Sequence, residues 1–135
     1  MHRKVQVILY VETTMQWLIL QVSPSRGGFW QNITGSVEHH ESFLHAASRE
    51  LFEETGIHIP SNLLIDICFT VYYDHPRLKQ VQERCFLVKL SDVPELTLSE
   101  EHQDYKWINT SDLTRQPFAF ESNLKATMQA IKFLD

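Results

Sequence analysis

The chain has 135 residues and a mass of 15.9 kDa, which predicts one domain over residues 1–135. Hydrophobic residues make up 43% of it, with 4 glycines and 5 prolines, which excludes wholesale disorder and low-complexity or collagen-like sequence. The formal net charge is −5, and residues 38–54 carry five carboxylates against one base. This balance argues against unaided binding to duplex nucleic acid, and the longest apolar stretches are too short to span a membrane.

The first half of the chain predicts two strands and one helix. Residues 5–11 are largely apolar and predict a strand buried on much of both faces, and residues 17–22 predict its neighbour. Residues 23–28 contain Pro, Ser and Gly and predict a loop. Residues 42–55 predict a helix, because apolar residues recur at helical spacing and Gly56 follows where helices commonly end.

The second half predicts further strands and a closing helix. Residues 63–73, 84–90 and 105–108 predict strands, with a polar loop over residues 74–82. A final helix begins near Ser122 as N-cap. Its apolar stripe, expected to pack on the core, consists of Leu124, Met128, Ile131 and Leu134. Strands flanked by two long helices predict an α/β (α+β) sandwich.

Cysteine and histidine usage argues against zinc and disulfides. Cys68 and Cys85 lie in apolar runs without CxxC spacing, which predicts buried free thiols in a reducing, cytoplasmic setting. His39, His40 and His45 are close in sequence, but adjacent histidines do not share a helix face and no cysteine is nearby. A zinc site is therefore disfavoured.

Three carboxylates share one face of the helix predicted over residues 42–55. Glu50, Glu53 and Glu54 stand at i, i+3 and i+4, a spacing at which like charges repel. One interpretation is a solvated acidic face relieved by Arg49, four residues before Glu53. The other is a site for a hard divalent cation such as Mg²⁺, which selects carboxylate oxygens.

The segment that contains this helix favours the second interpretation. Residues 35–57 run GSVEHHESFLHAASRELFEETGI and fill every position of the pattern G-x5-E-x7-R-E-U-x-E-E-x-G-U, where U is aliphatic. The chain thus resembles the Nudix family, and a chance match in so short a chain is far below about one in a million on single-residue frequencies. The resemblance implies a Nudix-like α/β/α sandwich with a mixed sheet, in which the box forms a loop–helix–loop.

The resemblance also implies roles for the box residues. Family members hydrolyse a nucleoside diphosphate linked to another group, using Mg²⁺ or Mn²⁺. Glu53 and Glu54 match the usual metal ligands, and Glu50 matches a residue that is a ligand or the general base. Gly35 matches a position whose carbonyl oxygen binds the metal. Arg49 and Glu41 match the pair that orients the loop–helix–loop.

The resemblance extends in patches beyond the box. Residues 29–38 (FWQNITGSVE) and 101–109 (EHQDYKWIN) resemble segments of the family branch that cleaves dihydroneopterin triphosphate and dATP, and Ser122-Asn123 also corresponds. Two departures lie near the expected substrate: Val22 replaces a basic residue, and the loop after residues 63–73 is shorter.

Candidate residues outside the box come from several segments. Glu101 matches an acid that family members supply from a separate loop, as ligand or general base; the alternative is an ordinary acidic turn. Four further residues are candidates for binding the terminal phosphates or the base, with a plain surface role as the alternative: Arg3, Lys4, His75 and Arg77. Trp30 is a candidate for stacking on the base, with rim or core packing as alternative. Together the expected substrate contacts are Arg3, Lys4, Trp30, Thr34, His75, Arg77 and Ser122.

The predicted function is hydrolysis of a nucleoside triphosphate or pterin triphosphate, of the dATP or dihydroneopterin triphosphate type, to the monophosphate and pyrophosphate. A carboxylate–Mg²⁺ cluster centred on Glu50, with Glu53, would activate the attacking water. Alternatives are a house-cleaning pyrophosphohydrolase of oxidised nucleotides or RNA 5′ ends, and a non-catalytic nucleotide-sensing module. The complete box argues against a sensor. The expected state is a monomer or homodimer without membrane or duplex partners.

Overall fold

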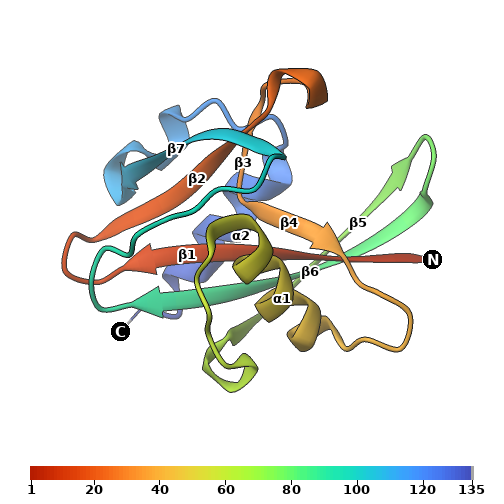
Figure 1. Ribbon diagram of the computed structural model, residues 1–135, viewed down its shortest axis with the longest axis horizontal. Coiled ribbons are helices and arrows are strands. Elements are labelled where there is room, and N and C mark those ends of the chain that lie inside the picture. The colour runs from red at the N-terminus through yellow and green to blue at the C-terminus, as the bar shows by residue number, and fades with distance from the viewer. Residues whose placement is uncertain (135) are drawn as a thin grey trace.

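A mixed seven-stranded sheet forms the centre of the computed structural model, which describes residues 1–134 (Figure 1). β1 (His2–Val11) is the central strand: it runs parallel to β6 (Lys79–Leu90) along its whole length and antiparallel to β2 (Gln16–Val22) and β4 (Ile33–Ser36). The other strands are β3 (Trp30–Gln31), β5 (Ile65–His75) and β7 (His102–Asn109). Strand order is β3-β2-β1-β6-β5, with β7 paired to β2.

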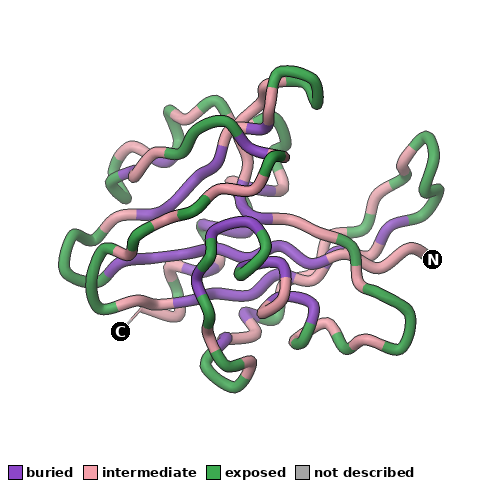
Figure 2. Tube along the Cα trace, viewed as in Figure 1, coloured by how far each residue is buried: buried purple, intermediate pink, exposed green. Residues whose placement is uncertain are grey.

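One helix covers each face of this sheet. α1 (Phe43–Thr55) lies in front of β1 and β6 in Figure 1, and α2 (Glu121–Ile131) lies behind them. Alternate residues of β1 enter two separate apolar cores, one containing Val7 and Leu51 and the other Ile8 and Ala126. Figure 2 shows the resulting buried path along β1. The predicted α/β/α sandwich, and a first strand buried on both faces, are confirmed. Three 3₁₀ turns complete the elements, at Pro24–Arg26, Ser61–Leu63 and Thr110–Arg115.

Both ends of α1 are capped, and Gly56 ends the helix as the sequence predicts. The Ser42 side chain accepts a hydrogen bond from the backbone N–H of His45 at 3.1 Å, which satisfies one of the free donors of the first turn. Gly56 ends the helix with φ of 78°, a left-handed conformation that glycine adopts without the steric cost of a Cβ. The predicted helix over residues 42–55 is confirmed.

The expected polar loop over residues 74–82 is wrong. β5 and β6 continue as an antiparallel hairpin in which His75 pairs with Lys79, so the turn is confined to residues 76–78. Ladder hydrogen bonds satisfy the backbone whatever the side chains, so exposed polar residues are tolerated on this arm. In Figure 1 the hairpin projects from the body of the molecule beside the N-terminus.

The prediction for the last helix needs two corrections. Its N-cap is Phe120, and Ser122 is already the second helical residue, so Ser122 is not the cap. The apolar stripe is also shifted: Met128 is 45% exposed, and the most buried positions are Asn123, Ala126, Thr127 and Ala130. Leu124, Ile131 and Leu134 still pack partly buried against the core. Small residues face the sheet because α2 lies close to it.

One cysteine also departs from expectation. Cys85 is buried, as predicted, but Cys68 is exposed and has a φ of 55° at the irregular pairing between β5 and β6. A bulge of this kind turns a side chain away from the face that simple alternation predicts. No helix within residues 1–134 combines the length and the apolar character needed to cross a membrane.

Candidate functional site

The loop that leads into α1 is tied to the helix through the Glu41 carboxylate. The backbone N–H of Glu38 donates to Oε1 of Glu41 at 3.0 Å, and Nδ1 of His45 lies 2.7 Å from Oε2. The Arg3 guanidinium on β1 donates to the backbone carbonyl of Glu41 at 3.2 Å. The loop is therefore fixed from both the helix and the sheet.

Arg49 joins this loop to the sheet. Its Nε and Nη2 donate to the two oxygens of Glu41, both at 2.8 Å, and Nη2 also donates to the carbonyl of Ser36 at 2.9 Å. A bidentate pair of this kind fixes orientation as well as charge. The hydrogen bonds from Arg49 lower the pKa of Glu41 to about 2, so the carboxylate stays ionised. The structure brings together the two residues expected to orient the loop.

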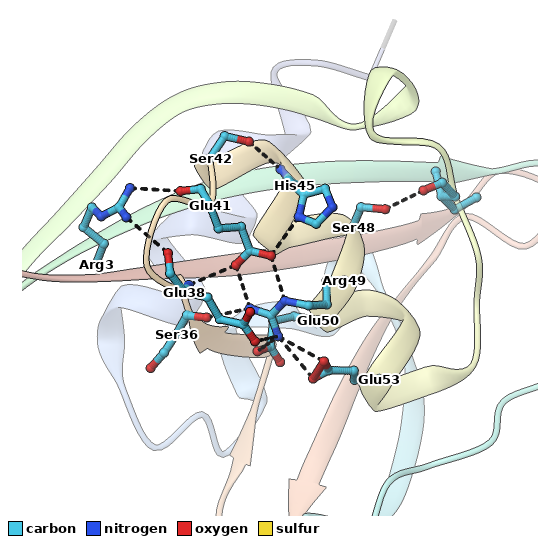
Figure 3. A network of polar contacts seen from close by, with 11 residues as sticks. Arg3, Ser36, Glu38, Glu41, Ser42, His45, Ser48, Arg49, Glu50 and Glu53 are labelled. Carbon is cyan, nitrogen blue, oxygen red and sulfur yellow. Dashed lines mark hydrogen bonds and ion pairs between the residues drawn. The ribbon is translucent and has the colours of Figure 1, made fainter.

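The third nitrogen of Arg49 faces two more box carboxylates. Nη1 donates to Oε1 of Glu50 and to Oε1 of Glu53, each at 3.0 Å, and Figure 3 shows this single guanidinium between the three acids. Glu50 and Glu53 are reached from the same helical turn, as their spacing predicts. The positive charge of the Arg49 guanidinium thus offsets the repulsion between Glu50 and Glu53 on one face of the helix.

Glu50 lies against Gly35 of β4. A Cβ atom added to Gly35 would lie 2.0 Å from the carboxyl carbon of Glu50, so only glycine allows the strand and this carboxyl to approach so closely. The Glu50 side chain is 11% exposed. Burial raises the pKa of Glu50 to about 7 against the opposing effect of Arg49, and the charges of Glu53 and Glu54 add to the increase. The local negative charge exceeds what Arg49 neutralises.

Glu54 has different surroundings from its two neighbours in the box. The Ser99 hydroxyl donates to Oε2 of Glu54 at 2.7 Å, and Nδ1 of His102 lies 2.6 Å from the same oxygen. Burial alone would raise the pKa of Glu54, but the contacts with His102, Glu101 and Ser99 outweigh it and hold the pKa well below its usual range. Sequence reasoning missed Ser99 and His102 as partners, although His102 directly follows the candidate Glu101.

Glu101 lies beside this group and faces the opposite wall. Its Oε1 is 2.8 Å from Nη1 of Arg26, in the 3₁₀ turn after β2. The neighbouring Glu54 carboxylate raises the pKa of Glu101, which makes Glu101 a better proton acceptor than an isolated glutamate. An acid from the loop before β7 therefore meets the box helix, as expected for Glu101.

A cleft of about 1350 Å³ joins these groups, which is ample for a nucleotide-sized ligand. One wall carries the box residues and another carries the β5–β6 hairpin and the start of α2. The predicted site residues that line it are Lys4, Thr34, Gly35, Glu50, Glu53, His75, Arg77, Glu101 and Ser122. Residues that sequence reasoning missed include Arg26, Phe29, Tyr73, Glu83 and Phe120.

Five predicted site residues are not among the described residues that line the cleft: the orienting pair Arg49 and Glu41, and Arg3, Trp30 and Glu54. Arg3 instead supports the box loop, as described above, and its guanidinium lies 5.4 Å from the ring centroid of Phe43. Trp30 packs against the core on the α2 side, with Nζ of Lys106 4.5 Å from its ring centroid. For Trp30 this placement favours the alternative of core packing, whereas Arg3 has a loop-supporting role that neither of its two interpretations anticipated.

The oxygen donors at the Gly35–Glu50 contact fit a hard divalent cation. Within residues 1–134, no three carboxylate, imidazole or thiol groups converge as a ready-made ion site, because Arg49 holds Glu50 and Glu53 while Glu54 faces His102. Mg²⁺ does not need such a cage: it is commonly held by one or two carboxylates, with substrate phosphates and water completing its shell. Glu50 and Glu53 both border the cleft, and their carboxylates are of the type that could hold such an ion.

The class of protein follows from comparison with known families. Residues 1–130 match the family model described as NUDIX domain, so the chain belongs to the Nudix family. It is a Nudix hydrolase, and enzymes of this family generally use divalent cations.

Individual relatives differ in what their names say they act on. The chain is 36% identical over 107 residues to an octanoyltransferase of Myxococcus xanthus, but spans only 29% of that protein's length. It is 32% identical over 114 residues to the dihydroneopterin triphosphate diphosphatase of Escherichia coli, covering 76% of this chain and 75% of that one. It is 34% identical over 119 residues to the asymmetrical bis(5'-nucleosyl)-tetraphosphatase of Rattus norvegicus, covering 87% of this chain and 78% of the relative.

A solved structure supports the likeness to the dihydroneopterin triphosphate diphosphatase of Escherichia coli. The E. coli dihydroneopterin triphosphate pyrophosphohydrolase superposes with a TM-score of 0.83 at 28% identity, covering 97% of this chain and 95% of that one.

Proposed function

We propose that the protein hydrolyses a nucleoside triphosphate or pterin triphosphate, of the dihydroneopterin triphosphate or dATP type, to the monophosphate and pyrophosphate. The observation that carries the proposal is the pairing of box carboxylates at one end of a nucleotide-sized cleft with cationic side chains along it, Lys4, Arg26 and Arg77. The likeness to the E. coli enzyme supports this substrate class.

The proposed roles follow from where each side chain lies. Glu50, Glu53 and the carbonyl of Gly35 would hold Mg²⁺ or Mn²⁺; Glu54, set beside them, would act as a ligand only after turning from His102. The bound ion would neutralise phosphate oxygens and lower the pKa of a bound water. Arg49 and Glu41 keep the box loop in place, and Lys4 and Arg77 offset the remaining phosphate charge.

Glu101 is the proposed proton acceptor. Three carboxyls that line the cleft, Glu50, Glu83 and Glu101, have a raised pKa; Glu50 is at the proposed ion site, and Glu83 on β6 is separated from Gly35 on β4 by β1. This leaves Glu101, on a separate loop, to take the proton from the attacking water. Arg26 keeps the Glu101 side chain in place through their ion pair.

Product analysis over a panel of triphosphates, with Mg²⁺, Mn²⁺ or a chelator, tests the proposal. We expect pyrophosphate and monophosphate from dihydroneopterin triphosphate or dATP, and loss of the activity in chelator. Inorganic phosphate as the first product would contradict the proposed cleavage position. Tight binding without cleavage of any substrate in the panel would favour a nucleotide-sensing module.

A second candidate activity rests on the likeness to the rat tetraphosphatase. The same box chemistry applied to a dinucleoside tetraphosphate would release a nucleoside monophosphate and a nucleoside triphosphate. Including diadenosine tetraphosphate in the panel separates the two activities. Its asymmetric cleavage would give AMP and ATP, whereas the triphosphate substrates would give a monophosphate and pyrophosphate.

A further inference from the structure

Glu83 is a buried carboxyl in the wall of the cleft that the proposed phosphate chemistry does not use. Only 4% of Glu83 is exposed, yet it lines the cleft. Among the residues that the structure describes, no Lys or Arg forms an ion pair with it, although the charge of Lys4 is near. A buried charge without a direct partner is costly, and a glutamine would fill the same space without that cost.

A chain of hydrogen bonds between buried side-chain amides determines whether Glu83 acts as a donor or an acceptor toward its neighbours. Nδ2 of Asn32 donates to the backbone carbonyl of Asn123, which can only accept, so the orientation of the Asn32 amide is fixed. The same nitrogen donates to Oε1 of Gln6 at 2.8 Å, and Nε2 of Gln6 then donates to Oε2 of Glu83 at 3.0 Å. Each amide thus sets the direction of the next, and Glu83 is held as an acceptor.

This arrangement leaves acceptor capacity on Glu83 for a ligand. A carboxylate has about four lone-pair positions; Gln6 uses one and the Tyr73 hydroxyl, which also lowers the pKa of Glu83 as a donor, uses a second. Burial raises the pKa of Glu83, so further donors from a ligand would stabilise its ionised form. Apolar and aromatic side chains border the same cleft, including Phe29, Val71 and Phe120, and they provide surfaces for a planar ring.

The distance from Glu83 to the proposed phosphate site suits a nucleoside. Lys4 of β1 pairs with Ser36 of β4 on one side and with Glu83 of β6 on the other. Two strand spacings separate β4 from β6, roughly 10 Å. This is about the length of a nucleoside, so a ligand with its phosphates near Gly35 would place its base near Glu83.

We propose that Glu83 reads the base of the substrate, accepting two parallel hydrogen bonds from the N–H and NH₂ donors on one edge of a pterin or guanine ring. Both rings carry a ring N–H between a carbonyl group and an exocyclic amino group, 2-amino-4-oxo in pterin and 2-amino-6-oxo in guanine. Adenine instead sets a ring acceptor next to its amino group, and that acceptor would face a carboxylate oxygen unfavourably. The inference rests on the proposed function, and it narrows that function toward pterin and guanine triphosphates over dATP.

The test compares base selectivity in the wild type and in Glu83→Gln. We expect the ratio of kcat/KM for dihydroneopterin triphosphate, or for dGTP, to that for dATP to fall roughly 10- to 100-fold in the variant. A ratio measured on one sample does not depend on the fraction of folded protein. Glu95→Gln, the same change at an exposed position outside the cleft lining, should leave the ratio unchanged. A fall for one of the two substrates alone would support the inference and identify the base.

Measuring the binding of compounds that carry the base but no triphosphate tests base recognition by Glu83 independently of the proposed hydrolysis. Calorimetry with 7,8-dihydroneopterin, dGMP and dAMP reports base recognition even if the wild type cleaves no triphosphate. Selective loss of dihydroneopterin or dGMP binding in Glu83→Gln would support the inference in that case. Equal selectivity of Glu83→Gln and wild type, in turnover or in binding, would overturn it whatever becomes of the hydrolysis proposal.

Discussion

The two ends of the cleft are built differently. At the box end, one guanidinium donates to three carboxylates and a backbone carbonyl, and a glycine is packed against Glu50. At the other end, the β5–β6 hairpin projects with exposed side chains such as Tyr72 and Leu78. Phosphate chemistry tolerates little displacement of its charges, whereas a binding wall can vary in length and composition. The comparison predicts large effects of substitution at the box end and small effects at the exposed positions of the hairpin.

The largest effect should come from Glu50→Gln, at the contact with Gly35. We expect kcat to fall roughly 10³-fold, because a charge that would act on the transferring phosphoryl group is lost. Pyrophosphate release in Mg²⁺ measures it. Thermal unfolding at pH 8 is the control: the variant should be at least as stable as wild type without metal, since it no longer buries an ionised carboxyl. Unaltered turnover would remove Glu50 from the mechanism.

A smaller loss, about 10²-fold in kcat with less change in KM, is expected for Glu101→Gln. The reason is that the proposed proton acceptor is lost while substrate contacts persist. Steady-state kinetics beside Glu100→Gln gives the matched comparison, because Glu100 is exposed and is not among the described residues lining the cleft. If the two variants exchanged behaviour, the roles of these neighbours would be reversed.

Acid should weaken the box end specifically through Glu41. Its pKa is about 2 in the folded protein against 4.5 ordinarily, so its contribution to stability is present above pH 4.5 and is lost as the pH falls toward 2. The size is about 1 kcal/mol once solvent screening is allowed for. Denaturant unfolding of wild type and Glu41→Gln at pH 7 and pH 3 should show a gap that narrows at the lower pH. If the difference in free energy of unfolding between wild type and variant were the same at both pH values, the stabilisation by the Arg49–Glu41 contact would not depend on the charge of Glu41.

The smallest effect is expected on the hairpin. Tyr72 is 64% exposed, so Tyr72→Ser should change the free energy of unfolding by less than about 0.5 kcal/mol. Urea denaturation measures it. A loss above 2 kcal/mol would show that the hairpin is more firmly packed than its exposure indicates.

The sequence predicted best where the signal was local. The box helix and its end at Gly56 depend on residues close together in the chain, and the family resemblance implied the pairing of Arg49 with Glu41. The short strand β4 was missed because its pairing with β1 joins segments roughly thirty residues apart, and β4 is too short for periodicity to be visible. The hairpin was cut short because its outer residues are polar, although pairing satisfies their backbone.

The missed parts of the site share one physical cause. Ser99, in the loop before β7, and His102, the first residue of β7, act on Glu54 from a distant part of the chain. The orientation of Glu83 is set through the side-chain amides of Gln6 and Asn32. Nothing in the sequence near Glu83 distinguishes it from a surface glutamate. Burial and long-range contact, which only the fold supplies, make it unusual.

The parallel pairing of β1 with β6 has a consequence for how the chain folds. The first strand cannot be completed until residues 79–90 have been made and brought back, and a contact of such wide separation is slow to form. If pairing of β1 with β6 takes part in the rate-limiting step, Leu9→Ala should slow refolding in stopped-flow experiments, whereas faster unfolding at an unchanged refolding rate would show that the pair forms later. Because Lys4 and Glu83 stand side by side across that pair, this part of the cleft cannot take shape during synthesis until the strand that ends at Leu90 has been made.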